Sequence, residues 1–157
     1  MKPIPLTWAH YEICYRLFQE IFERCEYDNF RASWKSRNPS ACYVMMRAGA
    51  LLGFILTTQD NCIQYIVVSS KHQGEGIGSA LLKKVLENLQ DAPSVWLKTA
   101  DDPRLAKWYE KYGFKPDHTY LAEDKTYLGT CMVKLQRGRR QTTRFSQECT
   151  LQALVEE

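Results

Sequence analysis

The sequence predicts one α/β domain in which a mixed sheet carries helices on both faces. Two observations lead to this prediction. Short β-branched or aromatic runs alternate with stretches of helical periodicity in the order β-α-α-β-β-β-α-β-α-β-β. The 157 residues allow one domain with a core, and 45% hydrophobic with 25% charged residues is typical of a globular protein. We expect residues 1–135 to form the domain, and residues 136–157 to be a tail that is basic and then weakly amphipathic.

The first half of the chain contains the expected edge of the sheet, a helical pair and a hairpin. Pro3 and Pro5 restrict the first strand to an edge or a bulge, because proline cannot donate to a strand ladder. Thr7 is a plausible N-cap for the long helix that follows. Gly49 lies in the turn between two apolar runs, as in a β-hairpin. The strands expected here are 2–6, 42–47, 51–58 and 62–68, and the helices are 7–24 and 28–35.

The second half alternates helices and strands. Apolar residues recur at helical spacing over 77–89. The next helix is marked at both ends, since Asp101 or Asp102 can cap it, Pro103 suits a first turn, and Gly113 stops it. The remaining strands are expected over 95–99, 114–120 and 130–135.

A glycine-rich loop between strand 62–68 and helix 77–89 is the most informative feature for function. Glycines at 74, 76 and 78 let backbone N–H groups turn toward one point, and the helix start adds its own unpaired N–H groups. This combination predicts an anion site, with phosphate as the expected occupant. A dinucleotide fingerprint is excluded because Leu81 stands where its third glycine belongs, and a P-loop is excluded because the run has no Gly-Lys pair. The alternative is that the glycines serve only a tight turn and close packing.

Two motifs in register resemble the GNAT superfamily of N-acetyltransferases. The loop Gln73-Gly74-Glu75-Gly76-Ile77-Gly78 matches the pyrophosphate loop of that family, Q/R-x-x-G-x-G/A. Downstream, a helix that ends at a glycine and enters the next strand matches a second family element through Tyr109, Lys111, Gly113 and Phe114. The resemblance covers roughly residues 2–135. It implies a mostly antiparallel, twisted sheet with splayed central strands, and acetyl-CoA as the cofactor.

The resemblance also implies roles for individual residues. The N–H groups of residues 74–79 would surround the pyrophosphate, and the preceding strand would pair with the pantetheine arm as if with another strand. The backbone N–H of Val68 would stabilise the oxyanion. Tyr109 would be the general acid for the departing thiolate; the alternative is a core aromatic beside Trp108 and Tyr112. The residues assigned to cofactor binding are Ile66, Val67, Val68, Gln73, Gly74, Glu75, Gly76, Ile77, Gly78, Ser79 and Tyr109. Lys71 and His72 either meet the 3′-phosphate or face solvent.

The general base and the acceptor stay open at the level of sequence. The strand before the loop offers Asn61 and Gln64 but no carboxylate, so water is an equal candidate for taking the amine proton. The acidic residues around the first two helices either favour a cationic amine or form a solvated face. These acids are Glu20, Glu23, Glu26 and Asp28. The candidates for the general base are Glu23, Glu26, Asp28, Glu123 and Asp124, and the alternative is that each is a solvated surface charge.

The sequence therefore predicts an acetyl-CoA-dependent N-acetyltransferase that moves an acetyl group to a primary amine by direct attack through a tetrahedral intermediate. The acceptor is a small-molecule amine or a peptide or protein amine. The alternative is a non-catalytic acetyl-CoA-binding regulatory or interaction module, with the Arg-rich tail as its contact. Discriminating the two requires an activity measurement with a panel of amines.

Composition limits the partners and the location. A net charge of +3 makes nucleic acid an unexpected partner. The six cysteines lack metal-ligand spacing, so no metal is expected, and we expect them to be free thiols. The N-terminus has no long apolar run, which predicts a cytoplasmic protein without a membrane segment. We expect a monomer or a homodimer.

Overall fold

A computed structural model describes residues 1–22, 27–100, 102–121 and 128–135. Its centre is one seven-stranded sheet in the order β1-β2-β3-β4-β5-β7-β6. The strands are β1 (Ile4–Pro5), β2 (Tyr43–Arg47), β3 (Ala50–Thr57), β4 (Cys62–Val68), β5 (Ser94–Ala100), β6 (Lys115–Leu121) and β7 (Leu128–Leu135). The helices are α1 (Tyr11–Ile21), α2 (Tyr27–Lys35), α3 (Ile77–Asn88) and α4 (Pro103–Glu110), with short 3-10 helices at Trp8–His10, Pro39–Ala41 and Ser70–His72.

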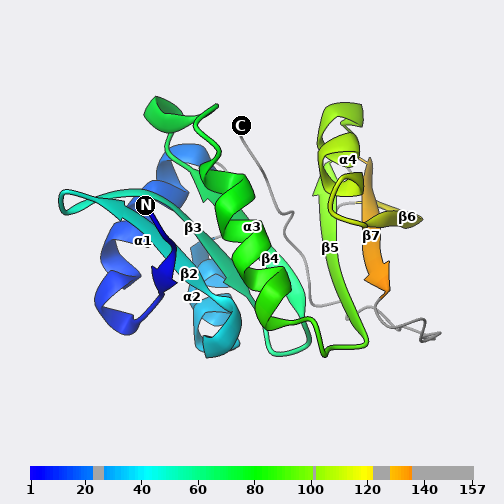
Figure 1. Ribbon diagram of the computed structural model, residues 1–157, viewed down its shortest axis with the longest axis horizontal. Coiled ribbons are helices and arrows are strands. Elements are labelled where there is room, and N and C mark those ends of the chain that lie inside the picture. The colour runs from blue at the N-terminus through cyan, green and yellow to red at the C-terminus, as the bar shows by residue number, and fades with distance from the viewer. Residues whose placement is uncertain (23–26, 101, 122–127, 136–157) are drawn as a thin grey trace.

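The predicted fold class is confirmed. β4 and β5 are parallel, and the other neighbouring strands of the sheet are antiparallel. Two apolar layers lie on opposite faces of the sheet. One joins α3 and α4 to the strands through residues such as Leu81, Val85 and Leu105. The other joins α1 and α2 to the strands and is rich in aromatic rings, among them Phe18 and Phe30, whose ring centroids are 4.6 Å apart. Figure 1 shows α3 crossing the face opposite α1 and α2.

The helix boundaries differ in detail from the predicted ones. Thr7 is an N-cap, but of the 3-10 helix Trp8–His10 that precedes α1, and its N–H donates to His10 Nδ1 at 3.0 Å. Of the two candidate caps for α4, Asp102 accepts a hydrogen bond from the Arg104 N–H at 2.9 Å. Gly113 follows α4 with a φ of 94°, a conformation that favours glycine, and so terminates it as predicted. The expected end of the first helix near residue 24, and the tail 136–157, lie outside the described residues.

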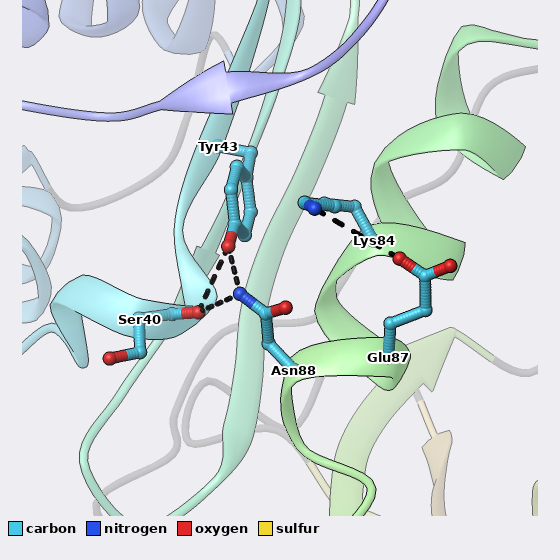
Figure 2. A network of polar contacts seen from close by, with 5 residues as sticks. All are labelled: Ser40, Tyr43, Lys84, Glu87 and Asn88. Carbon is cyan, nitrogen blue, oxygen red and sulfur yellow. Dashed lines mark hydrogen bonds and ion pairs between the residues drawn. The ribbon is translucent and has the colours of Figure 1, made fainter.

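A polar network fixes the C-terminal end of α3 against the start of β2 (Figure 2). The Asn88 side-chain amide donates to the Ser40 carbonyl at 2.8 Å and to the Tyr43 hydroxyl. The Tyr43 hydroxyl also donates to the Ser40 carbonyl, at 3.2 Å. These contacts join α3 to the 3-10 helix Pro39–Ala41 and to β2, so α3 is anchored at the end opposite the glycine loop.

The described cysteines only partly match the expectation of free thiols. Cys14, Cys42 and Cys131 are free and buried, whereas Cys62 is disulfide-bonded, so the expectation is wrong for Cys62. Burial raises the pKa of Cys42 to about 12 and that of Cys131 to about 12. Both thiols therefore stay protonated near neutral pH and pack as small apolar side chains. Among the helices that the structure describes, none has the length and apolar character of a membrane span.

Candidate active site

The central strands part in the middle of the sheet. β4 pairs with β5 at two positions, Cys62↔Trp96 and Ile63↔Leu97, and beyond them the two strands diverge (Figure 1). The separation begins next to a β-bulge: the pairing of β3 with β4 shifts from Thr57↔Ile63 to Leu56↔Tyr65, so that Gln64 is the extra residue of β4. The C-terminal half of β4 thus has β3 as its neighbour on one side and the diverging β5 on the other.

The backbone of β4 presents hydrogen-bonding groups to this opening. The Ser69 N–H donates to the Leu52 carbonyl at 2.8 Å, which places the polar groups of Ser69 on the β3 side. Because backbone groups point alternately to the two edges of a strand, Val68 and Ile66 direct theirs toward β5. Val67 directs its groups to β3, opposite Phe54. Of the three strand residues assigned to the cofactor, Ile66 and Val68 therefore offer backbone groups to the opening, and Val67 does not.

The glycine loop lies between the end of β4 and the start of α3. Gly74 and Gly76 both have a φ of 80°, in the left-handed region that favours glycine, and Gly76 is the N-cap of α3. A Cβ at either position would meet no atom within 4 Å. The two glycines are thus required by backbone conformation rather than by crowding, and the space beside them is open to a ligand. Gly78 is buried in the first turn of α3.

The side chains of the loop are unevenly distributed. Ile77 is buried, while Gln73 and Ser79 are half-buried at the helix start. Glu75 is exposed and pairs with two basic side chains: its carboxylate lies 3.6 Å from Arg47 Nη2 and 3.0 Å from His72 Nδ1. Lys71 is exposed. His72 therefore has a carboxylate partner within its own loop, a contact that its sequence position does not reveal.

Tyr109 lies on α4 and belongs to the same buried cluster as Ile66 and Val68. Its side chain is fully buried, and its ring contacts Trp108 and Phe114 at centroid distances of 5.1 and 5.8 Å. Burial raises the pKa of the Tyr109 phenol well above its usual value of 10. The phenol is thus protonated at neutral pH, as a proton donor must be, and its packing also fits the core-aromatic alternative.

One residue near the opening was not identified from the sequence. Thr99 is fully buried on β5, two positions beyond Leu97, the last residue that pairs with β4. Among the described residues its hydroxyl has no hydrogen-bond partner, which is costly for a buried polar group. The sequence does show a threonine near the end of an otherwise apolar strand. Threonine is common in strands, so this position alone does not indicate a functional residue.

The residues proposed for the acceptor side are largely outside the described structure. Glu23, Glu26, Glu123 and Asp124 are not described, and the side chain of Asp28 is not described either. Glu20 is exposed on α1. No group of three or more His, Cys, Asp or Glu side chains in the described residues is placed to hold a metal ion.

In the described residues, a glycine loop at a helix start lies next to a strand whose Ile66 and Val68 backbone groups point away from β3, and this arrangement suits an extended phosphate-containing cofactor. The profile of the acetyltransferase (GNAT) domain family matches residues 11–135. The chain belongs to the GNAT acetyltransferase family. Its expected cofactor, acetyl-CoA, is thereby confirmed, and acetyl transfer is the chemistry of the family.

Solved structures agree with this fold. The chain is similar to Ard1 from Thermoplasma volcanium, with 21% identity, a TM-score of 0.73, and coverage of 86% of this chain and 97% of that one. It is similar to the ribosomal-protein-S18-alanine N-acetyltransferase of Escherichia coli, with 18% identity, a TM-score of 0.71, and coverage of 92% and 99%. It also resembles Arabidopsis thaliana Naa50 in complex with the bisubstrate analogue CoA-Ac-MVNAL, with 17% identity, a TM-score of 0.70, and coverage of 85% and 97%. No curated protein matches the sequence.

Proposed function

We propose that the protein is an N-acetyltransferase that moves the acetyl group of acetyl-CoA to a primary amine by direct attack. The observation that carries the proposal is the open edge of β4 beside the glycine loop at the start of α3. The loop N–H groups of residues 74–79 suit the pyrophosphate, with Gln73 beside them, and the Ile66 and Val68 backbone groups suit the amides of the pantetheine arm. Acetyl-CoA supplies an activated thioester whose carbonyl carbon is electrophilic.

Two groups of the chain are proposed to act on the reacting atoms. The amine nitrogen attacks the carbonyl carbon, and the oxygen gains negative charge as a tetrahedral intermediate forms. The Val68 N–H, directed away from β3, is the proposed donor to this oxygen; the loss of one such donor typically costs about 3–4 kcal/mol. The carbon–sulfur bond then breaks, and the thiolate takes a proton from the Tyr109 phenol. The amine loses its proton to water or to a base that we do not assign, and the phenol takes up a proton again before the next turnover.

The acceptor is proposed only as a class. The solved relatives include an enzyme named for the alanine of ribosomal protein S18 and an aminoglycoside 6′-N-acetyltransferase complexed with coenzyme A. These names support a peptide or protein amine and a small-molecule amine alike. We propose residues 1–135 as the catalytic domain, in a cytoplasmic protein that is a monomer or a homodimer. Thiol release from acetyl-CoA in the presence of amines tests the proposal, since a non-catalytic binding module would bind the cofactor and release no thiol.

A further inference from the structure

Glu75 places a carboxylate in the middle of a loop that is proposed to bind phosphates. It is flanked by Gly74 and Gly76, the two residues whose left-handed conformation shapes the loop. A carboxylate at this position repels a polyanionic ligand unless its charge is balanced. Two basic side chains face this carboxylate: one oxygen lies 3.6 Å from Arg47 Nη2, and the other lies 3.0 Å from His72 Nδ1. The positive charge of the Arg47 guanidinium offsets the negative charge of the carboxylate.

Arg47 reaches the loop from a different part of the chain. It is the last residue of β2, at the β2–β3 turn, and its guanidinium lies 3.6 Å from Glu75. The Arg47 and Glu75 side chains are 49% and 40% exposed. Ion pairs with this much solvent around them are weak, so either partner is readily exchanged. A phosphate carries more charge than a carboxylate and accepts the bidentate hydrogen bonds that a guanidinium offers.

We propose that Arg47 is a cofactor-phosphate-binding residue that Glu75 holds beside the loop until the cofactor arrives. This inference rests on the proposed binding of acetyl-CoA to the glycine loop. When a phosphate of the cofactor enters, Arg47 exchanges its carboxylate partner for the phosphate. Glu75 is thus a competitor for Arg47, and its removal frees the guanidinium while also removing a repulsive charge.

The sign of the response to each substitution tests this exchange. By isothermal titration with CoA at low salt, Arg47→Met is expected to raise Kd roughly tenfold, since it removes a charge-assisted contact and keeps much of the side-chain length. Glu75→Gln is expected to lower Kd about two- to threefold, because it relieves like-charge repulsion. Arg47→Lys should raise Kd less than Arg47→Met does, since it keeps the positive charge and loses the bidentate geometry. The difference between wild type and Arg47→Met should shrink as salt increases.

Glu12 and Arg16 provide matched controls. They form an ion pair on α1 with the same 3.6 Å separation and greater exposure, 65% and 71%. Arg16→Met and Glu12→Gln make the same changes in charge and should leave CoA affinity unchanged. The proposal is overturned if Arg47→Met binds CoA as wild type does, or if Glu75→Gln weakens binding, which would mean that the pair only shapes the loop. If the wild-type protein does not bind CoA at all, the proposed function fails first.

Discussion

At the scale of single residues, Tyr109 has the largest consequences for the proposed chemistry. Tyr109→Phe is expected to lower kcat roughly 10²-fold or more, because it removes the proton that the thiolate needs, with little change in the KM for acetyl-CoA. Burial raises the pKa of the Tyr109 phenol, so the acid stays protonated as pH rises through neutrality and the loss should be similar at pH 7 and pH 9. Steady-state kinetics at both pH values measure this.

Tyr112→Phe is the control for Tyr109→Phe. Tyr112 lies three residues further on, contacts Trp108 at a ring-centroid distance of 5.1 Å, and is half-buried. The Tyr112→Phe variant should retain wild-type turnover. Wild-type turnover in Tyr109→Phe, with a normal melting temperature, would show instead that Tyr109 is a core aromatic and that the thiolate leaves without its help.

The buried hydroxyl of Thr99 gives a second residue-scale prediction. Thr99→Val replaces a buried hydroxyl that lacks a partner in the described residues by a methyl of similar shape, so the free energy of unfolding should rise by about 1 kcal/mol. If the hydroxyl serves the cofactor between the diverging strands, the KM for acetyl-CoA should also rise. Chemical denaturation and steady-state kinetics measure the two effects.

Thr57 supplies the comparison for Thr99. It is fully buried on β3, and its hydroxyl likewise lacks a hydrogen-bond partner among the described residues. Thr57→Val should raise stability by a similar amount and leave KM unchanged. Equal KM values for the two variants would place Thr99 outside the cofactor site.

At the scale of elements, the start of α3 determines whether the loop can bind an anion. Gly76→Ala introduces no contact within 4 Å but forces alanine to adopt a φ of 80°, which costs roughly 1–2 kcal/mol. The loop is expected to relax to another conformation, and CoA affinity should fall at least fivefold by isothermal titration.

Gly49→Ala is the control for Gly76→Ala. Gly49 lies in the β2–β3 turn with the same φ of 80°, and a Cβ there would likewise meet no atom within 4 Å. The Gly49→Ala variant should lose similar stability and keep CoA affinity within about twofold; an equal loss of affinity in both variants would contradict a specific role for Gly76.

Element positions were predictable where periodicity and end signals agreed. α3 and α4 were anticipated because apolar spacing, Asp102, Pro103 and Gly113 all indicate the same limits. The bulge at Gln64 and the 3-10 helix before α1 were not, since both depend on how the chain packs across the sheet and leave no local pattern. The glycine loop was found from the sequence because left-handed backbone is confined largely to one residue type.

Contacts between segments that are distant in the chain could not be predicted from the sequence, because no local pattern encodes them. The approach of Arg47 to Glu75 joins β2 to a loop nearly thirty positions later, and neither residue type is unusual where it stands. The Thr99 hydroxyl, which lacks a hydrogen-bond partner among the described residues, could be recognised only from its burial in the structure. The free thiols of Cys14, Cys42 and Cys131 followed from their apolar surroundings, whereas the disulfide of Cys62 did not.

At the scale of the whole molecule, the divergence of β4 from β5 is the feature on which the proposed cofactor site depends. The two strands pair at Cys62↔Trp96 and Ile63↔Leu97, next to a bulge, and then separate while β3 and β7 keep the rest of each strand paired. Each half of the sheet therefore stays paired within the described residues where β4 and β5 separate. The glycine loop and Tyr109 lie on segments that follow β4 and β5 respectively, so the divergence sets their relative position.

The central claim is that this opening supports acetyl transfer to an amine. The most direct measurement is thiol release from acetyl-CoA by the full chain, with a panel containing a peptide with a free N-terminus, a lysine peptide with a blocked N-terminus, a polyamine and an aminoglycoside. At least one amine is expected to accelerate thiol release and to become acetylated, which mass spectrometry of the product measures. Thermal stabilisation by CoA without thiol release for any of these amines would contradict the central claim and favour a binding module.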